Sequence, residues 1–286
     1  MSDRRGFALL AALWLLVALA TLAAGTLAAA RLGSETSANR IGLRRAARAA
    51  DACVAILLAH YDSTAPAAGV DTVDLGRTTW CRVTLQDPSA RLNLNHASKD
   101  QLVRLLGDPA LADAVLDWRD ADHVARAEGA ERDTYAALHR AAPRNGPFAD
   151  VLELRQVRGL ERFPEEWLEA RFTVEGDGAV NVSAAHRDVL DALGIFGEAD
   201  LDLILAARNS ARRLTSLDDL LARIGASRRD ELTPRYGELA STLKFAPREL
   251  VALIEGGVGP SALRAHIRLR VVPLPSRLAV VQREVW

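Results

Sequence analysis

The sequence has 286 residues, of which 49% are hydrophobic, and its formal net charge is −1. A chain of this length can form one sizeable core or two small ones, and its balanced charge is atypical of a dedicated nucleic-acid-binding protein. Its two cysteines, Cys53 and Cys81, exclude both a zinc site of paired cysteines and a disulfide-rich scaffold.

The first predicted element is a long helix that begins in an apolar segment. Phe7 to Ala30 contains no charged residue, and about 20 such residues can cross a bilayer as a helix. Apolar residues then recur at steps of three and four from Leu43 to Tyr61, which indicates one apolar face. We therefore predict a helix over residues 7–62, with residues 7–30 in the membrane and its second half packed on a folded domain.

The residues ahead of the apolar segment allow several interpretations of the N-terminus. In a secretory signal peptide, Arg4 and Arg5 would form the basic region and cleavage would follow the small residues at 28–30. Cleavage between Gly6 and Phe7 would instead keep the helix in the mature protein. This junction, Arg-Arg-Gly-Phe before an apolar helix, resembles the prepilin-peptidase site of type IV pilins and type II secretion pseudopilins. An uncleaved signal anchor is a further alternative.

Two strands are predicted next, between Val70 and Leu85, after a turn-rich stretch from Ser63 to Gly69. An internal repeat comes after them, in which Leu92 to Leu102 matches Val180 to Leu190. Both copies have an apolar–Asn–apolar start, then a capping-type polar residue, and then a helix. We expect Ser98 and Gln101 to form a capping box in the first copy.

Each copy of the repeat continues with further helical runs. A second run ends in Trp118-Arg119 in one copy and Ala207-Arg208 in the other. A third run begins at an expected N-cap, Asp150 or Ser216, and is expected to end at Gly159 or Gly225. We therefore predict two similar helical subdomains, over residues 93–171 and 181–239.

The C-terminal part is predicted to hold a short helix and a hairpin. The helix is expected from Pro247 to Glu255, with a glycine-rich turn after it at residues 256–260. Strands over residues 263–272 and 278–285, separated by Pro273 and Pro275, then close the chain as a hairpin.

Taken in order, these motifs resemble one family, the K-type minor pseudopilins of type II secretion systems (the general secretion pathway protein K family). The residues that carry the resemblance are Arg5-Gly6-Phe7 with the apolar segment, Leu92 to Ala97, Leu116 to Asp122, Gly129-Ala130-Glu131, Asn145 to Phe148, Glu153-Leu154-Arg155 with Gly159, and Val180-Asn181-Val182. The resemblance spans nearly the whole chain. The chain departs from the family pattern at Ser183, which occupies the place in the second copy of the repeat that Asn95 occupies in the first.

The resemblance implies an α+β fold: a pilin-like long N-terminal helix with an antiparallel sheet, and a large all-α insertion made of two similar helical subdomains. The predicted domains are a prepilin leader over 1–6, the helix over 7–62, a pilin-like α/β domain from 63–92, 172–180 and 240–286, and the helical subdomains over 93–171 and 181–239.

The resemblance also implies a non-enzymatic tip subunit of the secretion pseudopilus. Its partners would be the I- and J-type minor pseudopilins, the major pseudopilin and the prepilin peptidase. It would span the inner membrane once, with its C-terminal domain in the periplasm.

Pilins of this class usually carry a glutamate at the fifth mature position, which is Ala11 in this sequence. A carboxylate in the membrane needs a partner, and a first subunit has no neighbour ahead of it, so the missing glutamate fits a tip subunit.

The first helical subdomain contains an acidic insertion between Arg119 and Phe148, which the second lacks. Calcium prefers six to eight oxygen ligands in irregular geometry, and this segment has many carboxylates but few apolar residues. A solvated acidic loop is the alternative. The family resemblance favours calcium, because K-type members hold calcium in this domain. The expected ligands are Asp120, Asp122, Glu131 and Asn145, with Asp117, Asp150 and Glu153 in reserve.

Other functions find less support in the sequence. The six histidines lack metalloprotease spacing, and no nucleophile elbow or phosphate-binding loop is present, which argues against an enzyme. The repeats also resemble helix-hairpin-helix modules, so a membrane-anchored periplasmic module that binds nucleic acid or protein remains the alternative; the acidic insertion argues against nucleic acid. Cys53 and Cys81 are expected either to form a periplasmic disulfide or to remain as two buried thiols.

Overall fold

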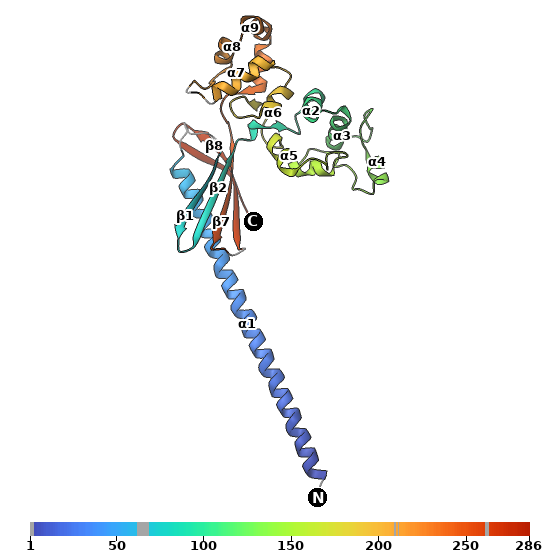
Figure 1. Ribbon diagram of the computed structural model, residues 1–286, viewed down its shortest axis with the longest axis vertical. Helices are drawn as coiled ribbons and strands as arrows, with labels where there is room; N and C mark the ends of the chain where they lie inside the picture. The colour runs from blue at the N-terminus through green and yellow to red at the C-terminus, as the bar shows by residue number, and fades with distance from the viewer. Residues whose placement is uncertain (1–2, 62–68, 209, 211, 261–262) are drawn as a thin grey trace.

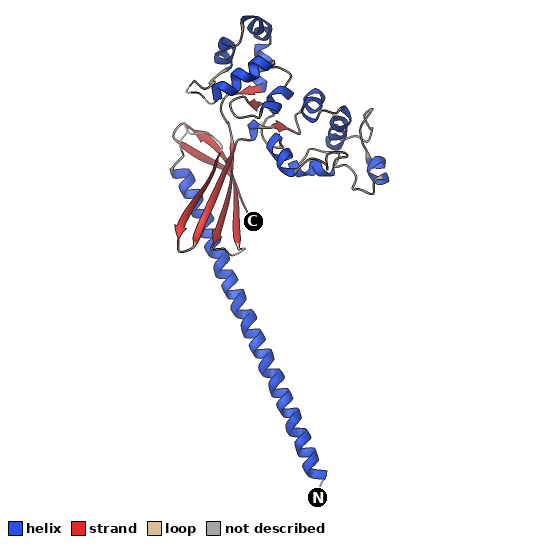
Figure 2. Ribbon diagram, in the orientation of Figure 1, coloured by secondary structure: helices blue, strands red, loops and turns tan. Residues whose placement is uncertain are grey.

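The computed structural model describes residues 3–61, 69–208, 210, 212–260 and 263–286, with the backbone alone at residues 3–11 and 69. A long helix lies against one face of a sheet, and its free half projects from one end of that sheet (Figure 1). A helical region sits at the opposite end of the sheet (Figure 2). The predicted turn-rich stretch at 63–68 lies outside the described residues, as do the side chains of Gly6, Phe7 and Ala11.

The helices are α1 (Asp3–Ala59), α2 (Lys99–Leu106), α3 (Pro109–Arg119), α4 (Arg132–Ala137), α5 (Glu165–Arg171), α6 (Arg187–Ala192), α7 (Glu198–Arg208), α8 (Leu217–Arg223), α9 (Ala226–Leu232) and α10 (Tyr236–Thr242). Short 3-10 helices are η1 (Pro88–Ala90), η2 (Val151–Gln156) and η3 (Thr233–Arg235). The strands are β1 (Gly69–Gly76), β2 (Thr79–Gln86), β3 (Leu92–Asn93), β4 (Phe172–Thr173), β5 (Val180–Asn181), β6 (Leu243–Lys244), β7 (Leu250–Val258), β8 (Arg264–Leu274) and β9 (Arg277–Val285).

Helix α1 is one continuous helix, as the sequence predicts. From Ala12 to Ala59 it has a mean hydropathy of 2.0 in its most apolar window, and none of that window is buried by the rest of the chain. By length and composition it is the one helix among the described residues that can cross a membrane. Its large apolar residues before Leu32 are exposed, which is the expected state for a segment whose apolar partner is lipid.

The second half of α1 packs on a five-stranded antiparallel sheet of order β1-β2-β7-β8-β9. In the register of neighbouring strands, Val83 faces Ile254 and Ile254 faces Ile267, so these side chains line one face of the sheet. With Ala49 and Ala50 of α1 they form an apolar core. The fold class is therefore α+β, with an N-terminal helix on an antiparallel sheet.

A close approach between α1 and the sheet depends on a glycine in β7. A Cβ atom at Gly256 would lie 2.2 Å from the backbone oxygen of Ala46 and 2.5 Å from the backbone nitrogen of Ala50. Both contacts are with helix backbone, which cannot move aside as a side chain can. Gly256 therefore lets the helix lie directly on the strand.

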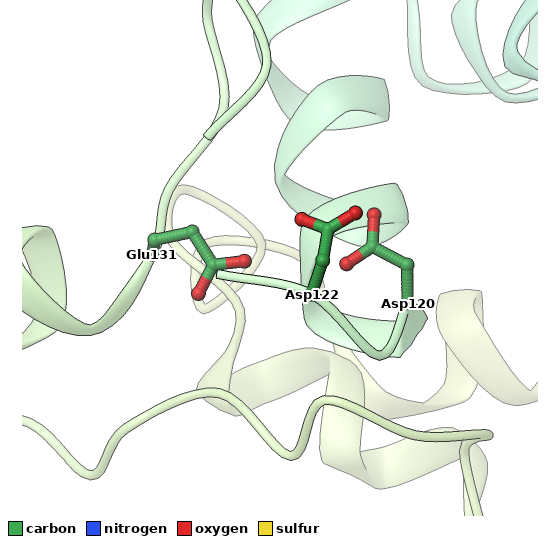
Figure 3. A group of neighbouring side chains, drawn as sticks. All are labelled: Asp120, Asp122 and Glu131. Carbon is green, nitrogen blue, oxygen red and sulfur yellow. The ribbon is translucent and has the colours of Figure 1, made fainter. Parts of the chain in front are cut away.

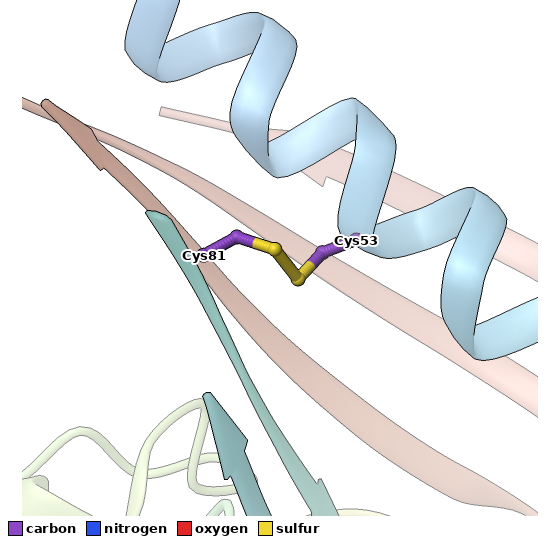
Figure 4. The surroundings of a disulfide bond; sticks show 2 residues. All are labelled: Cys53 and Cys81. Carbon is purple, nitrogen blue, oxygen red and sulfur yellow. A yellow bond between two sulfur atoms is a disulfide. The ribbon is translucent and has the colours of Figure 1, made fainter. Parts of the chain in front are cut away.

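A disulfide joins α1 to the sheet. Cys53 in α1 and Cys81 in β2 are bonded, with their Cα atoms 6.1 Å apart and both residues fully buried (Figure 4). The two cysteines are 28 residues apart in sequence, so the cross-link restricts the unfolded chain by roughly 3–4 kcal/mol in the loop-entropy model. The bond fixes the helix on the sheet within the apolar core that the two share.

The helical region is inserted between β2 and β7, which are neighbours in the sheet. Two short parallel pairs of strands close it into two stretches. Strand β3 pairs with β4 around residues 92–173, and this stretch is the first helical unit. Strand β5 pairs with β6 around residues 180–244, and this stretch is the second helical unit. The buried apolar side chains of both units form one continuous cluster, separate from the core between α1 and the sheet.

Several local predictions are confirmed by the structure. Ser98 and Gln101 form the capping box of α2, and Ser216 caps α8 by accepting a hydrogen bond from the Asp219 backbone. Asp150 caps the third helical run of the first unit. That run is the 3-10 helix η2 rather than an α-helix.

The predictions for the C-terminal part were wrong in three places. The stretch from Pro247 to Glu255, expected as a helix, enters β7 at Leu250, and Gly256 and Gly257 lie inside this strand rather than in a turn. The error has a physical cause: β7 is a central strand, so Val251 is buried on the outer face as well as Ala252 on the inner face, and the alternation is hidden. Pro273 lies within β8, near its end, rather than between the strands.

The third helical run is followed by a left-handed glycine, as predicted, in the first unit but not in the second. Gly159 has a left-handed φ of 83° after η2, as a helix-ending glycine should. Gly225 has a φ of −59° and serves as the N-cap of α9, so it begins a helix rather than ending one.

Candidate metal centre in the acidic insertion

Three carboxylates of the first helical unit come together where α3 ends and α4 begins. Asp120 is the C-cap of α3, Asp122 lies two residues later, and Glu131 is the N-cap of α4. One carboxylate oxygen from each lies within 4.8 Å of the others. Figure 3 shows Glu131 reaching toward Asp122 from the segment ahead of α4. The structure thus brings together three of the four ligands expected from the sequence.

Glu131 is buried, and its carboxylate is unpaired among the described residues. Only 7% of the residue is exposed, and neither carboxylate oxygen has a hydrogen-bond partner among the residues that the structure describes. Burial raises the pKa of the Glu131 carboxyl above its ordinary 4.5, and the charges of Asp117 and Asp120 raise the pKa further. The nearby Arg132 backbone N–H, which does not reach hydrogen-bond geometry, and the His123 side chain offset part of this rise in pKa. A buried carboxylate in this state is suited to a cation.

Asp117 supports the site from inside α3. It is fully buried, and its Oδ2 accepts a hydrogen bond of 2.8 Å from the backbone N–H of Ala130 and one of 3.2 Å from the backbone N–H of Arg126. A Cβ atom on Gly129 would lie 1.8 Å from the same oxygen. Asp117 therefore fastens the loop that delivers Glu131, and a glycine is required where the loop passes it.

An aromatic cluster holds the rest of the insertion to α3. Tyr135 of α4 is fully buried, and its ring centroid lies 5.4 Å from that of Trp118 in an edge-on arrangement. Phe148 stacks on Trp118 as well, at 6.5 Å. The Tyr135 hydroxyl accepts a hydrogen bond of 3.1 Å from the Arg158 backbone. The few large apolar residues of the insertion are therefore concentrated on one partner, Trp118.

The other ligands expected from the sequence lie outside the cluster of three carboxylates. The Asn145 side-chain amide donates to the backbone oxygen of Asp122 and lies 2.7 Å from the Nδ1 atom of His123, so Asn145 borders the cluster. Asp150 and Glu153 form the capping box of η2, and Glu153 also pairs with Arg144 at 2.9 Å. These two reserve ligands are engaged in holding η2.

Two residues of this region were given no structural role from the sequence: Arg126, and Gly129, which was noted only as part of the family motif. Arg126 is a cation among carboxylates, and its Nη1 donates to Asp117 at 2.5 Å and also to Asp120. A basic residue inside an acidic run is a visible sign of an internal ion pair. Gly129 gave no such sign, because its role depends on an atom of α3 that only folding brings near.

The arrangement is suited to a hard divalent cation. Carboxylate oxygens are the preferred ligands of calcium and magnesium, and calcium tolerates ligands from an irregular loop. The buried Glu131 and the Asp120 Oδ1 atom, which is also buried without a hydrogen-bond partner in the described part of the chain, provide oxygens for an ion at the cluster. The residues present therefore fit a metal ion, held by Asp120, Asp122 and Glu131.

Comparison with known proteins shows that the stretch around this site is similar to a known family. A family model described as "Type II secretion system (T2SS), protein K" matches residues 85–169, the stretch that contains the acidic insertion. Over 148 residues the chain is 33% identical to the type II secretion system protein K of Pseudomonas aeruginosa. Over these stretches the chain is therefore similar to the type II secretion system protein K family. The alignment covers 44% of the chain and 44% of the Pseudomonas protein.

The fold of this chain also resembles a solved structure. The structure is a chain of the GspK–GspI–GspJ complex from the type 2 secretion system of enterotoxigenic Escherichia coli. The TM-score is 0.58 at 18% sequence identity, and the match covers 90% of this chain and 98% of that one. At this identity the likeness concerns the fold alone.

Proposed function

We propose that this chain is a non-enzymatic minor pseudopilin that initiates or caps the tip of the type II secretion pseudopilus. Three features support the proposal: similarity to the protein K family over part of the chain, a fold shared along 90% of the chain with the solved complex chain, and the architecture of α1. The helix is apolar and unburied in one half and bonded to a sheet in the other, so it connects a membrane segment to a folded domain. The continuous run of α1 from the apolar segment onto the sheet carries the proposal, because a membrane-anchored binding module needs no anchor helix that continues into the core of its folded domain.

The proposed partners are the I- and J-type minor pseudopilins of the same bacterium, with the major pseudopilin below them. The test is co-purification of the full chain with tagged I- and J-type subunits from solubilised inner membranes. A matched control chain keeps residues 1–61 and carries an unrelated periplasmic domain. Capture of the full chain but not of the control supports the proposal. Equal capture of both chains would mean that the helix alone binds the partners. Capture of neither chain would contradict the proposal.

The helix is proposed to be processed between Gly6 and Phe7 by the prepilin peptidase and to remain in the inner membrane, with the C-terminal domain in the periplasm. Mass spectrometry of the membrane form should then find Phe7 at the N-terminus, in N-methylated form. A mature N-terminus near Arg31 would show that the apolar segment is a cleaved signal peptide, and the pseudopilin proposal would fail.

The tip position is proposed from Ala11, at the fifth residue of the predicted mature chain. A carboxylate there costs about 2.5–3.5 kcal/mol in the membrane unless it is paired, and a tip subunit has no neighbour to pair it. Ala11→Glu should therefore reduce secretion while leaving the amount of membrane-inserted protein unchanged. Normal secretion by this variant would remove the argument for the tip.

The acidic cluster is proposed to bind calcium, with Asp120, Asp122 and Glu131 as ligands and Asn145 at its border. Calorimetry should show uptake of calcium, and a chelator should lower the melting temperature, because a ligand that binds only the folded state stabilises it. No heat and no shift at millimolar calcium would leave the cluster as solvated charge.

The two helical units are proposed to be related copies, with subdomain boundaries at 93–171 and 181–239. Each has a helix-hairpin-helix arrangement with a left-handed glycine, Gly107 between α2 and α3 and Gly194 between α6 and α7. This feature favours the alternative of a nucleic-acid-binding module. However, the Arg104 side chain lies 3.1 Å from a Cβ position on Gly194, so the two hairpins face each other rather than a phosphate. A salt-sensitive shift of DNA by the protein would revive that alternative.

A further inference from the structure

A positive charge already lies beside the candidate metal site. Arg126 belongs to the loop between α3 and α4, and its Nη1 atom bridges two carboxylates, Asp117 Oδ1 at 2.5 Å and Asp120 Oδ2. Its side chain is 35% exposed, whereas that of Asp117 is fully buried. The guanidinium therefore reaches into the acidic region from the solvent side.

The two carboxylates that Arg126 bridges have different surroundings. Asp117 is fully occupied, because it also accepts hydrogen bonds from the backbone N–H groups of Arg126 and Ala130. Asp120 is only half occupied. Its Oδ2 atom accepts from Arg126, while its Oδ1 atom is buried and has no hydrogen-bond partner among the described residues.

Asp120 thus belongs to two groups at once. It pairs with Arg126 on one side, and on the other it is one of the three carboxylates whose oxygens lie within 4.8 Å of one another. Without a metal ion, those three like charges repel, and the guanidinium in contact with Asp120 offsets part of that repulsion. With a divalent ion in place, the guanidinium becomes a like charge a few ångströms from that ion.

We propose that Arg126 is an internal counter-ion of the metal site, which holds the metal-free insertion in place and weakens the binding of divalent cations. The proposal rests on the calcium site proposed above and adds what sets its affinity. A fixed positive charge on a shared ligand lowers the affinity of the site while keeping it assembled. The insertion is then folded both with and without the ion, and the site responds only to a high concentration of calcium.

The test compares full-length variants in detergent, titrated with calcium chloride by calorimetry and melted with and without calcium. Arg126→Gln removes the charge, and Arg126→Lys keeps a charge that cannot bridge two carboxylates in a fixed fork. Arg132→Gln removes an exposed arginine from the same insertion and is the matched control.

Arg126→Gln should bind calcium about 10-fold more tightly than the wild type and should melt at a lower temperature without calcium. Arg126→Lys should show a smaller gain of about 2- to 3-fold, and Arg132→Gln should stay within about 2-fold because an exposed charge is screened. If Arg126→Gln folds only when calcium is present, the counter-ion role is supported directly.

Equal or weaker calcium binding by folded Arg126→Gln would overturn the proposal, since it would mean that Arg126 only orients Asp120. If that variant does not fold at all, Arg126→Lys decides: tighter binding than the wild type supports the proposal, and equal or weaker binding overturns it. Calcium binding by Arg126→Gln but not by the wild type would support the counter-ion role of Arg126. It would also show that Arg126 prevents calcium binding in the wild type. Binding by neither would overturn the calcium site and this proposal together.

Discussion

The two helical units share the contacts that close them but differ in the segment after their longest helix. In the first unit, the Arg119 side chain at the end of α3 donates to the backbone oxygens of Leu94 and Ala97. In the second unit, the Arg208 side chain at the end of α7 donates to the equivalent oxygens of Val182 and Ala185. After Arg208 the chain makes a short link, whereas after Arg119 it enters the acidic insertion.

One position in the longest helix of each unit contributes to the difference between the segments that follow. Aligning Arg119 with Arg208 places Ala206 opposite Asp117. The first unit therefore carries a buried carboxylate where the second carries a methyl group, and this carboxylate fastens the loop around Gly129. The candidate metal site therefore depends on acidic residues and an aromatic anchor in the first unit.

The largest effect is expected from removal of the aromatic anchor in the first unit. Trp118→Ala deletes the ring that packs against both Tyr135 and Phe148, and should lower the free energy of unfolding by about 3–5 kcal/mol. Denaturant unfolding measures the loss, and calorimetry should show that calcium binding is lost with it. Calcium binding that persists unchanged would mean that the acidic cluster forms without the anchor.

The shared contact predicts equal effects in the two units. Partial burial lowers the pKa of both Arg119 and Arg208, and each half-buried guanidinium donates hydrogen bonds to two backbone oxygens. Arg119→Met and Arg208→Met should each cost about 2–3 kcal/mol in unfolding free energy, because carbonyl groups lose their donors. Chemical denaturation of the two variants side by side is the measurement. A large loss in one unit and none in the other would break the structural equivalence.

Substitution of Gly129, the glycine that passes Asp117, is expected to destabilise the first unit only. Gly129→Ala forces a methyl group against the buried Asp117 carboxylate, and should cost about 1–3 kcal/mol and weaken calcium binding. Gly146→Ala is the matched control in the same insertion, since the nearest atom to its Cβ position is 4.0 Å away. Thermal melts and calcium titrations of both variants provide the comparison. If both behave alike, the contact with Asp117 does not shape the loop.

The smallest effect on stability is expected at Glu131, although its effect on binding is large. Because its pKa is raised, this carboxyl stabilises the folded metal-free protein when protonated, and that stability is lost as the pH rises above 4.5 through the raised value. Glu131→Gln should therefore change metal-free stability by less than about 1 kcal/mol at neutral pH, without lowering it, and should abolish the calcium-induced rise in melting temperature. Melts between pH 5 and pH 7 should show a weaker pH dependence than the wild type. A metal-free protein that melts well below the wild type would indicate that Glu131 is paired.

The sequence alone determined the features that depend on neighbours along the chain. The apolar segment and the stripe after it predicted α1, because helical periodicity is local, and Ser98, Asp150 and Ser216 were recognisable as caps for the same reason. The motif order pointed to the family, and the density of acidic residues pointed to Asp120, Asp122 and Glu131.

Only the tertiary structure decided the features that depend on distant atoms. Strand β7 is enclosed by β2, β8 and α1, so its own residues show no alternation. The Cys53–Cys81 pair was one of two alternatives until the helix was placed on the sheet. The roles of Arg126 and Gly129 arise because Asp117, on a preceding helix, folds against their loop, and a contact of that kind leaves no periodic trace in a sequence.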